Sequence, residues 1–356
     1  MPTSICLNMI VKNEAHVIRR CLDSVRPYVD HWIIVDTGSA DGTQEIIRSH
    51  FHDVPGTLFE RSWRDFGANR SEAIALTRGK ADYVLVMDAD HAFGAPPGYR
   101  FDGLDADGYY VLHRYAGIEY GIAILLADRI PWRYEGVLHE FVTADLPHRI
   151  VPLAGPWVQI FHEGARSRDP ETYRKDAAIL EAALAKDPAN ARYAYYLAQS
   201  LKDAGALPAA LAAYRKRAAM PGWIEETWHA LYQAALLCER LALPPAEIER
   251  AYLEAYNARP VRAETLVALA RWHRSRHEWP LALMFARTAA ALPRPDDQLF
   301  VEDAAYAWQA MDEVAIAAWH AGARDEGRVA AQRLVAEGRF PEAERARIVK
   351  NLTYYD

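Results

Sequence analysis

Residues 32–43 read WIIVDTGSADGT, an apolar run that meets an aspartate and then a turn containing two glycines. A short apolar run bounded by turn residues is typical of a buried β-strand. Helical periodicity follows over 43–51, so this stretch predicts a strand at 32–35, a turn and a helix. A strand that leads into a helix is the repeating unit of a parallel α/β sheet.

The same alternation extends outward from this stretch to residue 87. Strands are predicted at 4–11, 57–60 and 83–87, with helices beginning after residue 13 and at 65–78. Asn13 is the expected N-cap of the first helix. That helix should bury one face made of residues at i, i+3, i+4 and i+7 spacing, namely Ile18, Cys21, Leu22 and Val25.

After residue 108 the pattern changes twice. The β-rich pieces 109–112 and 136–138 predict that a mixed sheet continues the first domain up to about Phe161. The polar segment 166–170 then ends in a proline, and we expect domains at 1–168 and 169–356.

The second half of the chain is alanine-rich and has a repeating pattern. Prolines recur at the spacing of a two-helix repeat, at Pro188, Pro221, Pro260 and Pro293. Similar helical segments lie between them, at 195–198, 231–234 and 267–270. Small residues where helices cross favour stacked helix pairs, so the sequence predicts a tetratricopeptide-like array.

Composition excludes several classes of protein. The 356 residues are 51% hydrophobic and 25% charged, with a net charge of −7, which gives no general attraction to a nucleic-acid backbone. No apolar stretch reaches the length of a transmembrane helix and no signal peptide is evident, so we expect a cytoplasmic protein. The cysteines Cys6, Cys21 and Cys238 are far apart, which predicts reduced core thiols.

Two groups of polar residues follow predicted strands at the edge where parallel sheets bind ligands. In the first, Asp36, Thr37 and Gly38 form a turn, and this turn either contacts a ligand or only caps the next helix. In the second, Asp88 and Asp90 would repel each other unless a divalent cation or hydrogen-bond donors compensate them. A solvated turn is the alternative for this pair.

These groups, taken in order, resemble the family-two glycosyltransferases of the GT-A fold. The resemblance rests on four segments: 8–14, 36–43, 66–71 and 88–90. A bacterial group in which tetratricopeptide-like repeats follow this domain also has counterparts of 132–140 and 161–164. The resemblance therefore implies an α/β GT-A domain, Rossmann-like with a mixed sheet, followed by an all-α tetratricopeptide-like repeat domain.

The resemblance also implies roles for individual residues in binding a nucleotide-diphosphate sugar, expected to be UDP-linked. Asn13 and Glu14 belong to the first motif, and Asp36 with its neighbours Thr37 and Gly38 would hold uracil and ribose. Arg70 would lie near the base or diphosphate. Asp88 would face the ribose or donor sugar, and Asp90 would bind Mn²⁺ or Mg²⁺, with His162 as a second ligand. At Thr37 and Ser71, near the positions that would bind the base, the sequence departs from the commoner family motif.

Inversion at the anomeric carbon needs one general base to deprotonate the acceptor hydroxyl or thiol. The dipeptide His139-Glu140 offers two candidates, and only one could face the site if the dipeptide lies on a strand. A carboxylate is the usual base in the family, which favours Glu140.

Two functions from different classes remain open. The first is an inverting, metal-dependent glycosyltransferase whose acceptor is a peptide, a protein or a surface glycan. The second is a protein-binding scaffold of helical repeats with an inactive transferase domain. The phosphate-loop and dinucleotide-binding glycine motifs are absent from the sequence, which argues against an ATPase or an oxidoreductase.

Overall fold

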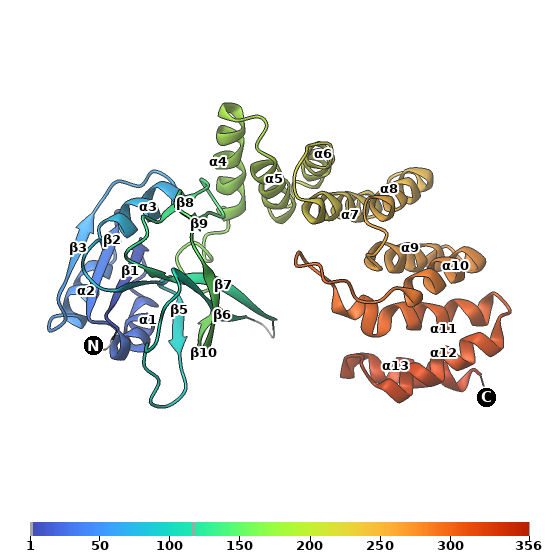
Figure 1. Ribbon diagram of the computed structural model, residues 1–356. Helices are drawn as coiled ribbons and strands as arrows, with labels where there is room; N and C mark the ends of the chain where they lie inside the picture. The colour runs from blue at the N-terminus through green and yellow to red at the C-terminus, as the bar shows by residue number, and fades with distance from the viewer. Residues whose placement is uncertain (1–2, 116–117, 356) are drawn as a thin grey trace. The chain divides into compact units, whose positions relative to one another are not determined.

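The computed structural model describes residues 3–115 and 118–355, and the chain divides into two compact units, Met1–Ala183 and Leu184–Asp356. The first unit contains a sheet with flanking helices, and the second is built from helices (Figure 1). The predicted fold class, an α/β domain with a mixed sheet followed by an all-α repeat domain, is confirmed. The division falls inside helix α4 (Thr172–Lys186), which begins just after the polar segment 166–170.

An eight-stranded mixed sheet forms the frame of the first unit. In spatial order its strands are β3 (Gly56–Glu60), β2 (His31–Asp36), β1 (Ile5–Val11), β4 (Tyr83–Val86), β7 (Ile118–Ala127), β6 (Gly108–Tyr115), β10 (Ile150–Ile160) and β5 (His91–Gly94). The first four strands are parallel to one another, whereas β7 is antiparallel to both β4 and β6. The four strands predicted up to residue 87 are therefore present, and the later β-rich region extends the same sheet.

The parallel strands bring three connecting segments to one edge of the sheet. Val11 of β1 pairs with Asp36 of β2, and Asn8 of β1 pairs with Val86 of β4. The carboxyl ends of these strands therefore lie side by side. The residues that follow β1, β2 and β4 leave the sheet at the edge where α/β proteins bind ligands.

Three α-helices accompany these strands: α1 (Ile18–Val25), α2 (Thr43–His50) and α3 (Phe66–Ala75). The predicted apolar face of α1 is confirmed, because all four of its residues are buried. The prediction that Asn13 caps this helix is wrong. Helix α1 begins at Ile18 without a side-chain cap, while the Asn13 side chain accepts a hydrogen bond from the backbone N–H of Ala40.

A buried amide attaches α3 to the sheet. Asn8 lies within β1 and is only 2% exposed. Its Nδ2 donates to the carbonyl oxygens of Ile33 and Ala73, each at 3.0 Å. Both amide hydrogens are thus satisfied, and α3 is held against β1 and β2 at a defined depth.

The strand predicted at 136–138 is not present. The two short strands β8 (Arg133–Glu135) and β9 (Phe141–Thr143) pair with each other, and residues 136–140 connect them. Gly136 and His139 have φ values of 113° and 53° there, in the left-handed region that an extended strand does not use. The alternation of faces expected for a strand-borne His139-Glu140 pair therefore does not apply.

The second unit is a succession of antiparallel helix pairs, in which each helix packs on the next (Figure 1). Its helices are α5 (Ala191–Asp203), α6 (Leu207–Ala218), α7 (Ile224–Arg240), α8 (Pro245–Ala258), α9 (Glu264–Ser275), α10 (Trp279–Ala291), α11 (Ala310–His320), α12 (Arg324–Glu337) and α13 (Glu342–Thr353). The four recurring prolines lie between helices, as the repeat pattern predicted. None of the described helices has the length and apolar character needed to cross a bilayer.

Candidate active site

The turn after β2 is organised around the buried carboxylate of Asp36. Its Oδ1 accepts hydrogen bonds from the backbone N–H groups of Gly38 and Ser39, each at 2.9 Å, and from the Gln44 amide at 3.0 Å. Burial opposes ionisation of Asp36, but these donors outweigh it and lower its pKa. Gly38 has a φ of 107°, a conformation that favours glycine.

The second oxygen of Asp36 has a different environment. Asp36 Oδ2 is buried and has no hydrogen-bond partner within the described part of the chain. A buried acceptor of this kind is costly unless a water or ligand donates to it. A role in the turn alone therefore explains only Oδ1, and Asp36 does not cap α2, which follows Gly42 without a side-chain cap. Thr37, in contrast, directs its hydroxyl to the Val11 carbonyl oxygen at 3.1 Å, a contact within the fold.

The segment after β1 is bound to the same turn. The backbone N–H of Asn13 donates to Ser39 Oγ, and that of Glu14 donates to Thr43 Oγ1, each at 2.8 Å. The Glu14 carboxylate accepts from the Ala165 N–H at 3.2 Å. Burial, with Asp90 and Asp88 adding repulsion, raises the pKa of Glu14 to about 7. The first two motifs thus form one hydrogen-bonded unit.

Arg70 connects two carboxylates that are far apart in the sequence. From α3, its Nη2 donates to Asp88 Oδ1 and its Nε donates to Glu140 Oε1. The Arg70 and Glu140 side chains are 13% and 12% exposed, whereas Asp88 retains 42%. Burial opposes ionisation of Asp88, but the neighbouring guanidinium outweighs it and lowers the pKa of Asp88 to about 2. The arginine therefore holds both carboxylates in fixed positions.

Asp90 is covered by the segment that follows β10. Its Oδ2 accepts from the Gly164 N–H at 3.0 Å, and its Oδ1 lies 3.7 Å from Nε2 of His91. A Cβ on Gly164 would come within 3.1 Å of Asp90 Oδ2, so glycine allows this close approach. The family-like segment 161–164 thus lies directly against Asp90.

Arg20 was not identified from the sequence, although it stabilises this segment. Its guanidinium pairs with Glu163 at 2.7 Å, donates to the Asp90 carbonyl at 3.1 Å and lies over the Phe161 ring at 3.7 Å. In the sequence, Arg20 is one charged residue on the outer side of α1. Only its partners distinguish it from any solvated arginine.

The two predicted histidines occupy different surroundings. His162 is exposed, has a φ of 51° and packs edge-on against Tyr115 with ring centroids 4.3 Å apart. It is two residues from Gly164, which contacts Asp90. His139 lies in the β8–β9 connection next to Glu140. The structure thus brings the predicted donor-site residues and Glu140 to one edge of the sheet, through the contacts described above.

The carboxylates at this edge could supply part of a divalent-ion site. Within residues 3–115 and 118–355, no three His, Cys, Asp or Glu side chains form a cluster that could hold a metal. Magnesium and manganese often need only one or two carboxylates when phosphate oxygens of a substrate supply the remaining ligands. Among the described residues no backbone donor engages Asp90 Oδ1, so this carboxylate fits such a shared site.

Part of the chain is similar in sequence to known proteins. Residues 6–95 match the family described as "Glycosyl transferase family 2". A TPR repeat-containing protein of Synechococcus elongatus is 42% identical over 87 residues, which are 24% of this chain and 20% of that protein. The SPbeta prophage-derived glycosyltransferase SunS of Bacillus subtilis is 33% identical over 92 residues, 26% of this chain and 21% of that protein. The matched region thus spans about a fifth of these curated relatives.

Two solved structures align with about half of the chain. A MamA protein gives a TM-score of 0.37 at 15% identity, over 49% of this chain and 85% of that one. A tetratricopeptide repeat protein from Parabacteroides merdae gives 0.38 at 18% identity, over 51% of this chain and 68% of that one.

Proposed function

Because residues 6–95 belong to glycosyl transferase family 2, we propose that the chain is an inverting glycosyltransferase that moves a sugar from a UDP-sugar to a hydroxyl or thiol. The observation that carries the proposal is Asp36 Oδ2, a buried acceptor without a partner among the described residues at the ligand-binding edge of the sheet. A uracil N–H is the kind of donor that this oxygen lacks. Asn13, Glu14, Thr37 and Gly38 position the loops around the base and ribose.

Departure of the nucleotide is the second part of the proposal. Asp90 would hold Mn²⁺ or Mg²⁺ together with diphosphate oxygens, and the exposed His162 ring is the proposed second protein ligand. When bound, such an ion neutralises the charge that accumulates on the leaving diphosphate. Asp88, fixed by Arg70, would accept hydrogen bonds from the ribose or donor sugar. Arg70, paired with Asp88 and Glu140, would lie near the base or diphosphate.

Glu140 is the proposed general base. Its Oε1 is engaged by Arg70, so Oε2 is the atom that would accept the acceptor's proton. The deprotonated acceptor oxygen or sulfur forms the new bond to the anomeric carbon as the bond from that carbon to the diphosphate oxygen breaks. The ion pair with Arg70 also fixes Glu140 relative to Asp88. A single arginine therefore positions both the proposed base on the acceptor side and the carboxylate on the donor side.

A binding screen tests the proposal. UDP-, GDP- and CMP-sugars are titrated calorimetrically into the full chain, with and without Mn²⁺, and donor hydrolysis is then followed. We expect UDP-sugars to bind most tightly, with a clear gain from Mn²⁺ and slow release of UDP. If no nucleotide-sugar binds and none is hydrolysed, the chain is instead a helical-repeat scaffold with an inactive transferase domain.

A further inference from the structure

The helical unit contains a cavity that the proposed chemistry does not use. It has a volume of about 740 Å³, within the range of ligand sites. Its walls come from α9, α11 and α13 and from a π-helical turn at Ala305–Gln309 that precedes α11. Such turns are rare and are frequently found at functional sites.

The lining of this cavity contains more acidic than basic side chains. Five carboxylates and three arginines line it. Each arginine is already paired: Arg274 with Glu313 at 2.7 Å, Arg347 with Asp312 at 2.8 Å, and Arg271 with Glu239 at 3.0 Å. Glu239 lies outside the cavity lining. The arginines are therefore not free to bind an anion, and the lining retains an excess of negative charge.

Glu302 accounts for much of this excess. It lines the cavity, where it remains exposed, and forms no ion pair within residues 3–115 and 118–355. The neighbouring Glu264 is engaged by Arg262 at 2.8 Å, and its Oε1 also accepts the Glu302 N–H at 3.1 Å. Partial burial, with the Glu264 charge adding to it, raises the pKa of Glu302, while Arg262, the Tyr232 hydroxyl and Arg271 act more weakly in the opposite direction. A cation next to Glu302 would relieve both effects.

Other lining groups favour a particular kind of cation. The aromatic side chains Trp308 and Trp319 can stack on the guanidinium plane of an arginine or pack against the aliphatic part of a lysine or arginine. The carboxamides of Gln309 and Asn351 can exchange hydrogen bonds with a peptide backbone. The volume exceeds that of one side chain, so the residues on either side of a basic residue would also enter.

We propose that this cavity binds a polypeptide segment through a lysine or arginine side chain placed at Glu302. The inference goes beyond the proposed sugar transfer and does not depend on it. The site lies wholly within the helical unit, and its occupation can be measured without a donor.

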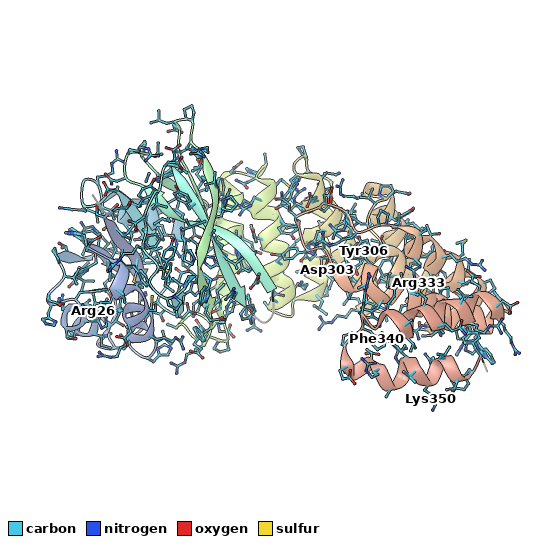
Figure 2. All side chains as sticks on the ribbon, turned by 60° about the horizontal axis from the view of Figure 1, so that its bottom comes forward. Arg26, Asp303, Tyr306, Arg333, Phe340 and Lys350 are labelled. Carbon is cyan, nitrogen blue, oxygen red and sulfur yellow. The ribbon has the colours of Figure 1, made fainter. Side chains whose placement is uncertain are left out.

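Two matched variants test the proposal in the full chain. Glu302→Gln removes the charge and keeps the shape of the side chain. Asp303→Asn is the control, because Asp303 is the next residue, is 70% exposed and pairs with Arg294 outside the cavity lining. Figure 2 labels Asp303 together with Tyr306, which lies in the π-helical turn.

The chains are screened against a synthetic array of randomised dodecapeptides, and the best binders are titrated in solution. We expect the unaltered chain and Asp303→Asn to select peptides containing lysine or arginine. Glu302→Gln should bind those peptides about tenfold or more weakly, while its affinity for UDP stays unchanged. An array without binders, a preference for neutral or acidic peptides, or equal binding by Glu302→Gln would overturn the proposal.

Free spermidine separates the polypeptide from a small polyamine. It carries the same ammonium chemistry without a peptide backbone. We expect it to bind much more weakly than the selected peptides and to displace them only at high concentration. If spermidine binds as tightly as the peptides and displaces them, the site is a polyamine site and the polypeptide assignment is wrong.

Discussion

At the scale of single residues, the candidate site depends on carboxylates whose two oxygens have different tasks. Asp36 Oδ1 holds the turn after β2, whereas Oδ2 is buried without a partner among the described residues. Asp90 Oδ2 accepts a hydrogen bond from Gly164, whereas Oδ1 has no backbone donor within the described part of the chain. One oxygen fixes the side chain and leaves the other for a ligand. Substitutions that keep the shape and change one oxygen can therefore separate folding from binding.

Asp36→Asn should weaken UDP binding about 10- to 100-fold, because an amide N–H₂ replaces the acceptor oxygen that the nucleotide would use. The remaining amide oxygen can still accept from Gly38 and Ser39, so thermal unfolding should change little. Calorimetric titration of UDP measures the effect. Asp53→Asn is the control, since Asp53 is an exposed partner of Arg26, which Figure 2 labels in the first unit. Equal UDP affinity in Asp36→Asn and the control would contradict the nucleotide-binding role.

Asp90→Asn should remove most of the gain in UDP affinity that Mn²⁺ provides and leave metal-free binding nearly unchanged. The amide oxygen can still accept the Gly164 N–H, but the carboxylate charge that attracts the ion is lost. Titrations of UDP with Mn²⁺ and with EDTA give the two affinities. A variant in which Mn²⁺ strengthens UDP binding as much as in the unaltered chain would eliminate Asp90 as a metal ligand.

Glu140→Gln should lower the rate of transfer by about 10²- to 10⁴-fold, as expected when a positioned base is lost. The amide oxygen can still accept from Arg70, so UDP affinity should change little. Turnover on a true acceptor is compared with that of His139→Gln, whose effect should be smaller. Full activity in Glu140→Gln would exclude Glu140, and a selective loss in His139→Gln would assign the role to His139.

At the scale of elements, the position of Arg70 depends on how closely α3 approaches the β8–β9 connection. The Gly67 N–H donates to the Gly136 carbonyl oxygen at 3.1 Å, and Ser71 exchanges hydrogen bonds with the backbone of Tyr134. These contacts place Arg70 of α3 next to Glu140 of the connection. The pairing of the arginine and the proposed base is thus a consequence of helix packing.

Gly67→Ala should disturb this contact, because a Cβ would lie 2.3 Å from the Gly136 carbonyl oxygen. This clash is with a backbone atom, so either α3 or the β8–β9 connection would have to shift. We expect a destabilisation of about 1–3 kcal/mol and a fall in turnover, since Arg70 and Glu140 would separate. Denaturant unfolding and transfer assays measure the two effects. An alanine variant with unchanged stability and rate would show that this close approach does not matter.

At the scale of the whole molecule, we expect the two compact units to have separate functions, donor binding in the first and polypeptide binding in the second. The residues of the proposed donor site all lie in Met1–Ala183, and the cavity around Glu302 lies in Leu184–Asp356. Helix α4 contains the division, and its Asp176 pairs with Arg166 of the preceding segment. We propose the functional boundary near residues 166–170, just before α4 begins.

A shortened chain of residues 1–186 should bind UDP with Mn²⁺ about as tightly as the full chain and hydrolyse the donor at a similar slow rate. It should fail to transfer sugar to the natural acceptor if the helical unit selects that acceptor. A chain ending at residue 168 is the comparison, and we expect it to be less soluble because the partners of α4 become exposed. Loss of UDP binding in a folded 1–186 chain would mean that the helical unit helps to build the donor site.

The sequence by itself determined the elements and their order. Hydrophobic periodicity is a local property, so it identified the first four strands, the buried face of α1 and the helical repeats. Because parallel strands end at a common edge, the sequence also indicated that Asp36, Asp88 and Asp90 lie at one edge. Local signals gave the wrong structure at two places. Residues 136–140 include left-handed residues and form a connection instead of the predicted strand, and Asn13 does not cap α1.

Only the tertiary structure decided which side chains meet. Arg70 contacts Glu140 across 70 residues, Gly164 reaches Asp90 across 74, and Ala165 reaches Glu14 across 151. Neither the unpartnered oxygen of Asp36 nor the excess charge around Glu302 has a sequence signature, because each depends on which groups elsewhere in the fold are already paired. Local periodicity specifies elements, whereas hydrogen bonds and ion pairs between distant segments depend on how those elements pack.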